Sequence, residues 1–298
     1  MSIALATQFA GRALRDEPMS RHTSWRVGGP ADVFFTPRDR EDLADFMARL
    51  PKDAPVLWVG LGSNLLVRDG GIRGVVVCTH GALSRLERRT EQRVYCEAGV
   101  PCARVTRKCA NWGLGHAEFF AGIPGTMGGA LAMNAGAYGG ETWSYVRAVE
   151  VMARDGRSRS RQASEYLVSY RHVDAPANDE WFLAAELEFG AADPAAAGEV
   201  RRQAQQRKLT QPLGEWSCGS VFTNPPGDHA ARLIEAAGLK GKRIGGAVVS
   251  EKHANFILNE GGASAADLEE LIALIRESVR REQGIELVPE VRIVGESA

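Results

Sequence analysis

The sequence predicts a mixed α/β protein of two domains. Its 298 residues exceed what one hydrophobic core usually organises, and 44% apolar with 24% charged residues is an ordinary globular balance. Short β-branched runs fill the N-terminal third, whereas helical patterns recur toward the C-terminus. The segment GAADPAAAGE at 190–199 interrupts both patterns. We therefore place the domain boundary there.

The charge balance argues against a general nucleic-acid binder. Lys plus Arg number 36 and Asp plus Glu 37, giving a formal net charge of −1, whereas such binders carry a basic excess or stripe. The densest basic run predicts a solvated helix face and comprises Arg201, Arg202, Arg207 and Lys208.

Membrane insertion and secretion are not indicated. No apolar run approaches the roughly 20 residues of a membrane helix, and the start MSIALATQFAG lacks the basic n-region of a signal peptide. The five cysteines are an odd number without a CxxC pair. This argues against a disulfide framework and a metal site and fits a reducing cytoplasm.

The N-terminal elements follow from apolar runs and turn residues. We expect strands at 56–59, 65–67, 75–77, 94–98, 146–153 and 181–189. A helix is expected between Pro101 and Gly113, because proline favours the first helical turn and glycine the end. Val105 and Cys109 lie four apart on it and should face the core.

The C-terminal elements combine helices with short strands. A helix at 230–237 is closed by Gly238, and strands are expected at 247–250 and 255–259. Ser264 and Asp267 have capping-box spacing for a helix that ends at Gly284. Its core face comprises Leu268, Leu271, Ile272, Ile275 and Val279. An extended segment follows, with Ile285, Leu287, Val291 and Ile293 on one side.

Neither the GxGxxG pattern nor the Walker pattern of phosphate-binding loops occurs in the sequence. Any phosphates that the protein binds must therefore be held by another kind of site. Two glycine-rich turns remain, GLGSN at 60–64 and the stretch 122–140. Glycines allow backbone N–H groups to converge in an anion-binding nest. For GLGSN alone, a tight hairpin turn is the simpler interpretation.

Three polar positions could carry chemistry, and each has a plain structural alternative. Ser220 in SCGSVFTNP is flanked by turn residues, yet the segment also fits a strand after a turn. Glu290 fits a surface carboxylate, and Tyr170–Arg171 fits a polar strand end. The sequence contains no GxSxG elbow, so a hydrolase is not indicated. Composition and spacing alone therefore name no reaction.

Taken together in order, seven segments resemble the UDP-N-acetylenolpyruvoylglucosamine reductase (MurB) family of peptidoglycan synthesis. The ordered set spans nearly the whole chain and is specific, although single pieces are weak. The length resembles the shorter, type II branch. The matching segments are HTSWRVGGPAD (22–32), GLGSNLL (60–66), AGIPGTMGGALAMNAGAYGG (121–140), SYR (169–171), SCGSVFTNP (217–225), LIEAAGLKGKRIGGAVVSEKHANFILN (233–259) and PEVRIVG (289–295).

The resemblance implies an α+β fold with an FAD-binding domain of the PCMH/vanillyl-alcohol-oxidase type and a C-terminal α/β substrate-binding domain. We expect the FAD domain at 1–195, in lobes at about 1–78 and 79–195, and the substrate domain at 196–298. FAD would be held non-covalently. The implied cofactor contacts are Arg26, Gly60, Leu61, Gly62, Ser63, Asn64, Leu65, Gly122, Ile123, Pro124, Gly125, Thr126, Gly128, Gly129, Asn134 and Gly136.

The same resemblance implies a cytoplasmic reaction in which NADPH reduces FAD and the enolpyruvyl group of UDP-N-acetylglucosamine enolpyruvate then takes a hydride. Arg171 would grip the substrate carboxylate in a forked geometry. Ser220 would protonate the new carbanion, and Glu290 would share a proton with the carboxylate. The implied substrate contacts are Tyr170, Lys208, Asn224 and His253. No obligate protein partner is evident.

One departure and two rival functions stand beside this interpretation. The family commonly has lysine in SVFKNP, where this chain has Thr223. Cys218 is expected to be a small packing residue. A sugar or hydroxy-acid oxidase of the same fold would often carry a flavin-linked histidine in an SGGH-type segment, which is absent. His116 is not expected to be such an attachment site, but either a surface residue or one that lies behind the site. A non-catalytic nucleotide-binding protein would not need Arg171, Ser220 and Glu290 together.

Overall fold

The structure is a computed structural model that describes residues 11–298, so the N-terminal segment considered above as a signal peptide lies almost wholly outside it. Contacts between Cα atoms divide the chain into two compact units. Unit 1 contains residues 11–15, Val33–Leu61 and Gly74–Ala204, and unit 2 contains Asp16–Asp32, Gly62–Arg73 and Gln205–Ala298. The predicted division at 195–196 is a different partition of the chain, and it remains a proposal.

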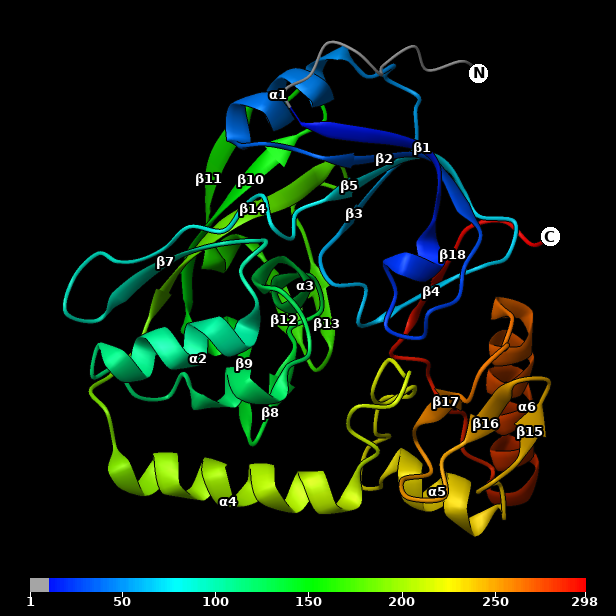
Figure 1. Ribbon diagram of the computed structural model, residues 1–298. Helices are drawn as coiled ribbons and strands as arrows, with labels where there is room; N and C mark the ends of the chain where they lie inside the picture. The colour runs from blue at the N-terminus through cyan, green and yellow to red at the C-terminus, as the bar shows by residue number, and fades with distance from the viewer. Residues whose placement is uncertain (1–10) are drawn as a thin grey trace. The chain divides into compact units, whose positions relative to one another are not determined.

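A four-stranded sheet and one helix build the first layer of unit 1 (Figure 1). Phe35 of the sheet and Phe46 of α1 (Arg40–Arg49) stack with ring centroids 3.8 Å apart, and both are fully buried. The third and fourth strands run parallel, with Val56 opposite Val75. The sheet order is β1 (Arg12–Pro18), β2 (Pro30–Thr36), β5 (Ile72–Cys78) and β3 (Val56–Val59).

An antiparallel five-stranded sheet forms the second layer of unit 1. Its inner face packs on α2 (Cys102–Asn111) and α3 (Met127–Ala132). Val105 and Cys109 are both fully buried in this core, which confirms the predicted helix face. Pro101 caps α2 and Gly113 follows it with φ +71°. The sheet order is β11 (Ser158–Gln162), β10 (Val146–Ala153), β14 (Glu180–Glu188), β7 (Arg93–Glu97) and β6 (Leu86–Arg88).

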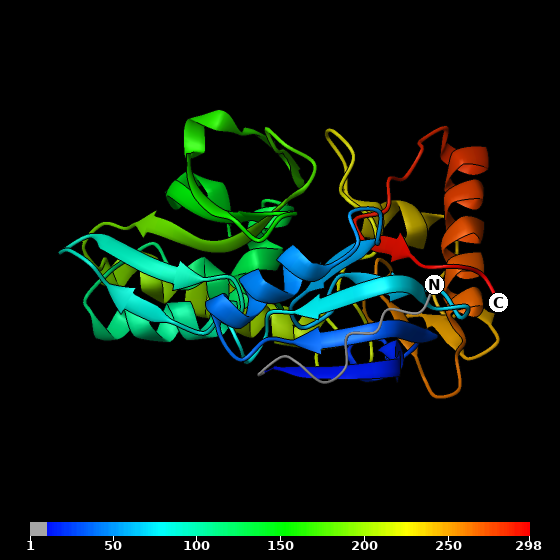
Figure 2. The same cartoon turned by 90° about the horizontal axis from the view of Figure 1, so that it is seen from above.

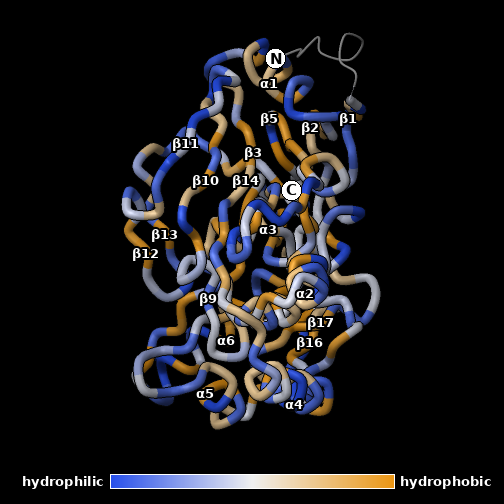
Figure 3. The backbone as a smooth tube through the Cα atoms, turned by 90° about the vertical axis from the view of Figure 1, so that its left-hand side faces the viewer, coloured by the Kyte–Doolittle hydropathy of each residue, from blue (hydrophilic) through white to orange (hydrophobic). Residues whose placement is uncertain are grey.

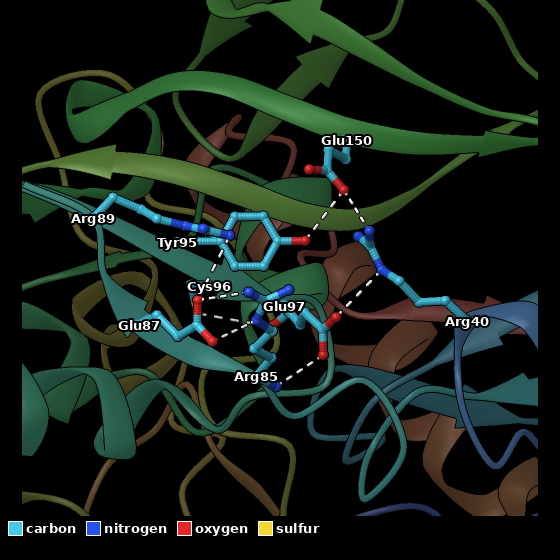
Figure 4. Close-up of polar contacts among 8 residues, drawn as sticks. All are labelled: Arg40, Arg85, Glu87, Arg89, Tyr95, Cys96, Glu97 and Glu150. Carbon is cyan, nitrogen blue, oxygen red and sulfur yellow. Dashed lines mark hydrogen bonds and ion pairs between the residues drawn. The ribbon is translucent and has the colours of Figure 1, made fainter.

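An ionic cluster joins α1 to this sheet (Figure 4). Arg40 at the start of α1 pairs with Glu150 of β10 at 2.6 Å and with Glu97 of β7 at 3.2 Å. The Tyr95 hydroxyl donates to Glu150 at 3.2 Å. Because Glu97 is 7% exposed, its charge requires these partners. The cluster holds the start of the helix on two interior strands of the sheet and therefore has a structural role.

Unit 2 is organised around α6 (Ala265–Gln283), the long helix at one end of Figure 2. Ser264 and Asp267 form the predicted capping box, and Gly284 ends the helix with φ +69°. The whole predicted core face is 0–3% exposed. Around it lie α5 (Ala230–Ala236) and a small sheet of order β15 (Arg243–Ile244), β16 (Ala247–Val249) and β17 (Ile257–Asn259).

Two short parallel strands of unit 2 change the interpretation of GLGSN. Leu65–Val67 (β4) pairs with Arg292–Val294 (β18), whereas β3 before the turn pairs with β5. The turn at 60–64 therefore connects strands of different sheets, and the hairpin interpretation is wrong. The pattern of apolar runs could not reveal this, because strand partners lie far apart in the sequence.

The segment 190–199 is not a simple break, because α4 (Pro194–Thr210) begins inside it. The Asp193 carboxylate accepts the Ala195 N–H at 2.9 Å, which satisfies an open donor of the first turn. Alanine then favours the helix. No residue of α4 is buried, and Figure 3 colours much of it hydrophilic. The expected solvated basic face is thereby confirmed.

Candidate active site

The two predicted glycine turns meet within unit 1. A Cβ added at Gly60 would lie 2.2 Å from Thr126 Oγ1, so the absence of a side chain at Gly60 permits this approach. Thr126 is 2% exposed, and its Oγ1 has no hydrogen-bond partner among residues 11–298. A buried hydroxyl of this kind normally requires a partner. The place fits a polar ligand such as the diphosphate of FAD.

The glycines of the second turn also serve local packing. The N–H of Gly128 donates to the Ala98 carbonyl at 2.8 Å, and a Cβ at Gly128 would lie 3.0 Å from that of Ala98. A Cβ at Gly140 would enter the Phe119 ring. The glycine content of 122–140 therefore combines a close backbone approach with the fit of α3 against its own domain core.

Gly62, Ser63 and Asn64 of GLGSN lie in unit 2, where Gly62 approaches the main chain closely. Gly62 has φ +60°, and a Cβ on it would lie 1.9 Å from the His22 carbonyl oxygen. Arg26 also has a positive φ, +57°, and its guanidinium lies 4.5 Å from the centre of the Trp216 ring. Its role as an FAD contact stays a prediction.

Arg171 lies at the turn of a hairpin in unit 1, between β12 (Leu167–Ser169) and β13 (His172–Asp174). It adopts φ +57°, which few residues without glycine's freedom adopt. Its guanidinium donates to the Gly136 carbonyl at 2.9 Å and to the Asn134 carbonyl at 3.3 Å. The predicted catalytic arginine is thus fixed on the predicted cofactor stretch.

Asn134 and Glu141 complete this arrangement. The Asn134 side chain is 2% exposed and donates to Glu141 Oε2 at 3.0 Å and to the Ser169 carbonyl at 3.1 Å. Its Oδ1 accepts the Trp143 N–H. Glu141 belongs to β9 (Gly140–Glu141), which pairs with β8 (Gly136–Ala137). Sequence analysis did not single out Glu141, because no motif signals its contact with Asn134.

Ser220 and Glu290 belong to neighbouring segments of unit 2. The carbonyl of Val221, the residue after Ser220, accepts the Glu290 N–H at 2.8 Å. Asn255 holds the same segment. Its main-chain carbonyl accepts the Val221 N–H, and its side chain accepts from the N–H of Phe222 and donates to the Phe222 carbonyl. Only an isolated bridge between Phe222 and Pro289 forms here, so the alternative of a regular strand is wrong.

Two residues beside Ser220 have structural contacts. Cys218 is buried. Its burial is the main cause that raises the pKa of its thiol well above the ordinary value, and the nearby charge of Glu290 is the second cause. This confirms Cys218 as a packing residue. The Thr223 hydroxyl donates to the Val288 carbonyl at 3.2 Å, so the residue that replaces the family's lysine is joined to the segment before Glu290.

The four predicted substrate contacts differ in their surroundings. The Tyr170 ring lies 4.9 Å from the Arg171 guanidinium, and Lys208 is exposed on α4. The side-chain Oδ1 of Asn224 accepts the Ala230 N–H at the start of α5. The His253 Nδ1 is buried without a partner in the described part of the chain. Burial, then nearby Arg207 and Lys240, lower the pKa of His253.

Arg171 lies in unit 1, whereas Ser220 and Glu290 lie in unit 2. Within unit 2 the segment that follows Ser220 is bonded to the main chain of Glu290, and within unit 1 the Arg171 guanidinium is bonded to Asn134 and Gly136. His116 is exposed, as expected. Across residues 11–298, no helix has the length and apolar character needed to cross a bilayer.

Comparison with known proteins identifies the family. The model for the UDP-N-acetylenolpyruvoylglucosamine reductase C-terminal domain matches residues 211–294, and that for an FAD-binding domain matches 31–160. The UDP-N-acetylenolpyruvoylglucosamine reductase of Alkalilimnicola ehrlichii is 59% identical over 94% of both chains. That of Methylococcus capsulatus is 57% identical over 98% of this chain and 96% of its own.

This chain belongs to the UDP-N-acetylenolpyruvoylglucosamine reductase family. The crystal structure of the family member from Thermus caldophilus has a TM-score of 0.81 at 31% identity, covering 96% of this chain and 99% of its own. The 6-hydroxy-D-nicotine oxidase of Arthrobacter nicotinovorans, at 14% identity, shares the fold with a TM-score of 0.50 over 92% of this chain and 60% of its own.

Membership of this reductase family confirms several predictions. The protein is an FAD-dependent oxidoreductase with the expected α+β, PCMH-type fold, and the resemblance drawn from seven segments is correct. The family assignment places it in peptidoglycan synthesis. The Gly60–Thr126 approach is consistent with the FAD-binding match at 31–160, whereas the individual cofactor contacts remain predictions.

Proposed function

We propose that the protein reduces the enolpyruvyl group of UDP-N-acetylglucosamine enolpyruvate with electrons from NADPH and forms the lactyl ether of UDP-N-acetylmuramate. The names of the relatives support the substrate class. The observation that supports the mechanism is the adjacency of the segments that carry Ser220 and Glu290, because the carbonyl of Val221, next to Ser220, accepts the Glu290 N–H at 2.8 Å. When bound, FAD would supply the redox chemistry, which is uptake of two electrons from NADPH and delivery of a hydride to the methylene carbon.

Arg171 stabilises the charge that this hydride creates. After addition, negative charge develops on the adjacent carbon and spreads into the substrate carboxylate. A guanidinium presents parallel N–H donors that match a carboxylate, and lysine lacks this fork. The bonds from Arg171 to the carbonyls of Asn134 and Gly136 hold its plane before substrate arrives. Such preorganisation is what electrostatic stabilisation requires.

Ser220 donates the proton that completes the reduction. Its hydroxyl hydrogen moves to the carbanion carbon, and water returns a proton to the serine oxygen afterwards. Glu290, held beside this segment, shares a proton with the substrate carboxylate, because an unprotonated carboxylate there would oppose the developing charge. The hydride and this proton together convert the enol ether to the lactyl ether, so atoms and charge balance.

The remaining residues hold the UDP-sugar and the cofactor. Lys208 supplies positive charge to the diphosphate, and Tyr170, Asn224 and His253 contact the substrate. The lowered pKa of His253 keeps its ring neutral at pH 7, so it binds through hydrogen bonds rather than charge. The glycine turns at 60–64 and 122–136 hold FAD, with residues 1–195 as the cofactor domain and 196–298 as the substrate domain. Reaction in the cytoplasm fits the five free cysteines.

Two anaerobic half-reactions test this proposal. NADPH should bleach the flavin absorbance of the holoenzyme, and the enol ether should then restore it with formation of UDP-N-acetylmuramate. NADH serves as the matched donor, and a UDP-sugar without the enolpyruvyl group is the control oxidant. Reduced flavin that the enol ether fails to reoxidise would refute the proposed function.

A further inference from the structure

We infer that Glu141 is a positioning residue for the reduction, acting through Asn134 on Arg171. This inference rests on the proposed role of Arg171. Glu141 is not part of any motif that the sequence analysis used, and its carboxylate lies beside the arginine in unit 1.

The geometry shows which contact of Glu141 matters. Glu141 Oε2 accepts the side-chain N–H of Asn134 at 3.0 Å, a normal hydrogen bond. Glu141 Oε1 lies 3.9 Å from Arg171 Nη1, which is too long for a hydrogen bond. With the Glu141 side chain 39% exposed, water also weakens this charge interaction. The bond to Asn134 therefore carries most of the effect.

Asn134 transmits this contact because both polar atoms of its side chain and its main-chain carbonyl are engaged. Its side chain binds Glu141, the Ser169 carbonyl and the Trp143 N–H, while its own carbonyl accepts from Arg171. Ser169 is close to Arg171 in the same hairpin. At 2% exposure and φ +46°, Asn134 sits in a conformation that its surroundings must maintain.

The backbone adds a second connection. Gly136, whose carbonyl accepts from Arg171 Nη2, is paired with Glu141 between β8 and β9. A Cβ at Gly136 would lie 3.1 Å from Glu141 Cγ and 3.2 Å from Arg171 Nη1. Glu141 thus contacts both places that hold the guanidinium. Loss of its acceptor should let the arginine turn away from the substrate carboxylate without removing any group that touches substrate.

The test compares Glu141→Ala with Glu141→Gln, which keeps an acceptor oxygen for Asn134. We expect Glu141→Ala to lower kcat/KM for the enol ether about 10-fold to 100-fold, and Glu141→Gln to stay within about 3-fold. Flavin reduction by NADPH should change less than about 2-fold in both. Substrate binding by calorimetry should weaken for Ala and recover for Gln. Glu186→Ala, a β14 carboxylate paired with Arg93, is the matched control.

A double-mutant cycle separates this inference from the proposed function. If Glu141 acts through Arg171, Glu141→Ala should add less than about 2-fold in an Arg171→Ala background. The positioning role is overturned if Glu141→Ala causes the same loss in both backgrounds, or if it slows the NADPH half-reaction by the same factor. In either case a loss of activity in Arg171→Ala itself leaves the proposed function intact. Normal turnover by Arg171→Ala overturns both.

Discussion

The side-chain amide of Asn64 donates a hydrogen bond to the main-chain carbonyl of Glu290 at 2.9 Å. The Arg292 N–H returns a bond to the Asn64 carbonyl at 3.1 Å, where β18 begins beside β4. Asn64 of the predicted cofactor turn is therefore joined to the main chain around Glu290 within unit 2. The Glu290 side chain can be altered without disturbing either bond.

Glu290→Gln isolates the function of the carboxyl group, because the main-chain contacts with Asn64 and Val221 remain. We expect turnover of the enol ether to fall about 10²-fold to 10³-fold, as for loss of one electrostatic stabiliser. Flavin reduction by NADPH should stay within about 2-fold of wild type. Stopped-flow absorbance measures both steps. Glu286→Gln, an exposed carboxylate paired with Arg276, is the control. Equal losses in the two steps would contradict a role for Glu290 in the second.

Ser220→Ala should stop the reaction after flavin reduction. Removal of a general acid typically lowers the rate about 10²-fold to 10⁴-fold, and no described contact makes the Ser220 hydroxyl essential for folding. The measurement is steady-state NADPH oxidation alongside rapid flavin reduction. Ser217→Ala, in the same loop, is the control. A Ser220→Ala enzyme that turns over near the wild-type rate would show that another group donates the proton.

Gly60→Ala should weaken FAD binding. The new Cβ would lie 2.2 Å from Thr126 Oγ1, so the buried Thr126 side chain or one of the two turns must shift. We expect the FAD Kd to rise at least about 10-fold, measured by titration of the apoprotein with flavin fluorescence. Gly198→Ala in α4, where a Cβ meets nothing within 4 Å, is the control. If a clash with Thr126 causes the defect, Thr126→Gly should relieve it. If neither Thr126→Ser nor Thr126→Gly changes the defect, the clash is not the cause.

Buried thiols predict a loss of stability at high pH. Burial raises the pKa of Cys102 and Cys109 to about 12 from 9.0. Above pH 9 the unfolded chain releases protons that the folded protein retains, so stability is complete below pH 9 and falls as pH rises toward 12. Urea unfolding between pH 8 and 11 measures this.

The variant Cys109→Ala tests the thiol contribution directly. Its unfolding free energy should fall less steeply above pH 9 than that of wild type, by up to about 1.4 kcal/mol per pH unit. Below pH 9 the two proteins should differ by a constant amount, which reflects the lost packing. Parallel curves over the whole range would show that Cys109 does not titrate in this way.

The sequence predicted an element well where the residues that determine it all lie within that one segment. The helix at Ala265–Gln283 was predictable, because Ser264, Asp267 and Gly284 mark its ends and its apolar face repeats. The start of α4 at Pro194 was missed, because an alanine-rich segment after Asp-Pro resembles a linker. Sequence alone could not give the parallel pairing of Leu65–Val67 with Arg292–Val294, because these two segments lie far apart along the chain.

The candidate site divides in the same manner. The resemblance to the family pointed to Arg171, Ser220 and Glu290 as candidate catalytic residues. It did not show which contacts hold them in place. The bonds from Arg171 to the carbonyls of Asn134 and Gly136 depend on backbone atoms, which carry no sequence signature. The left-handed conformation of Arg171 was equally hidden, because such a φ is expected of glycine.

The most direct test of the account is NADPH oxidation by the purified FAD enzyme, measured with and without UDP-N-acetylglucosamine enolpyruvate. The account predicts yellow protein, slow oxidation of NADPH alone, and rapid oxidation with substrate that yields one UDP-N-acetylmuramate per NADPH consumed. Protein that holds no flavin after reconstitution, or NADPH oxidation that the enol ether does not accelerate, would contradict it.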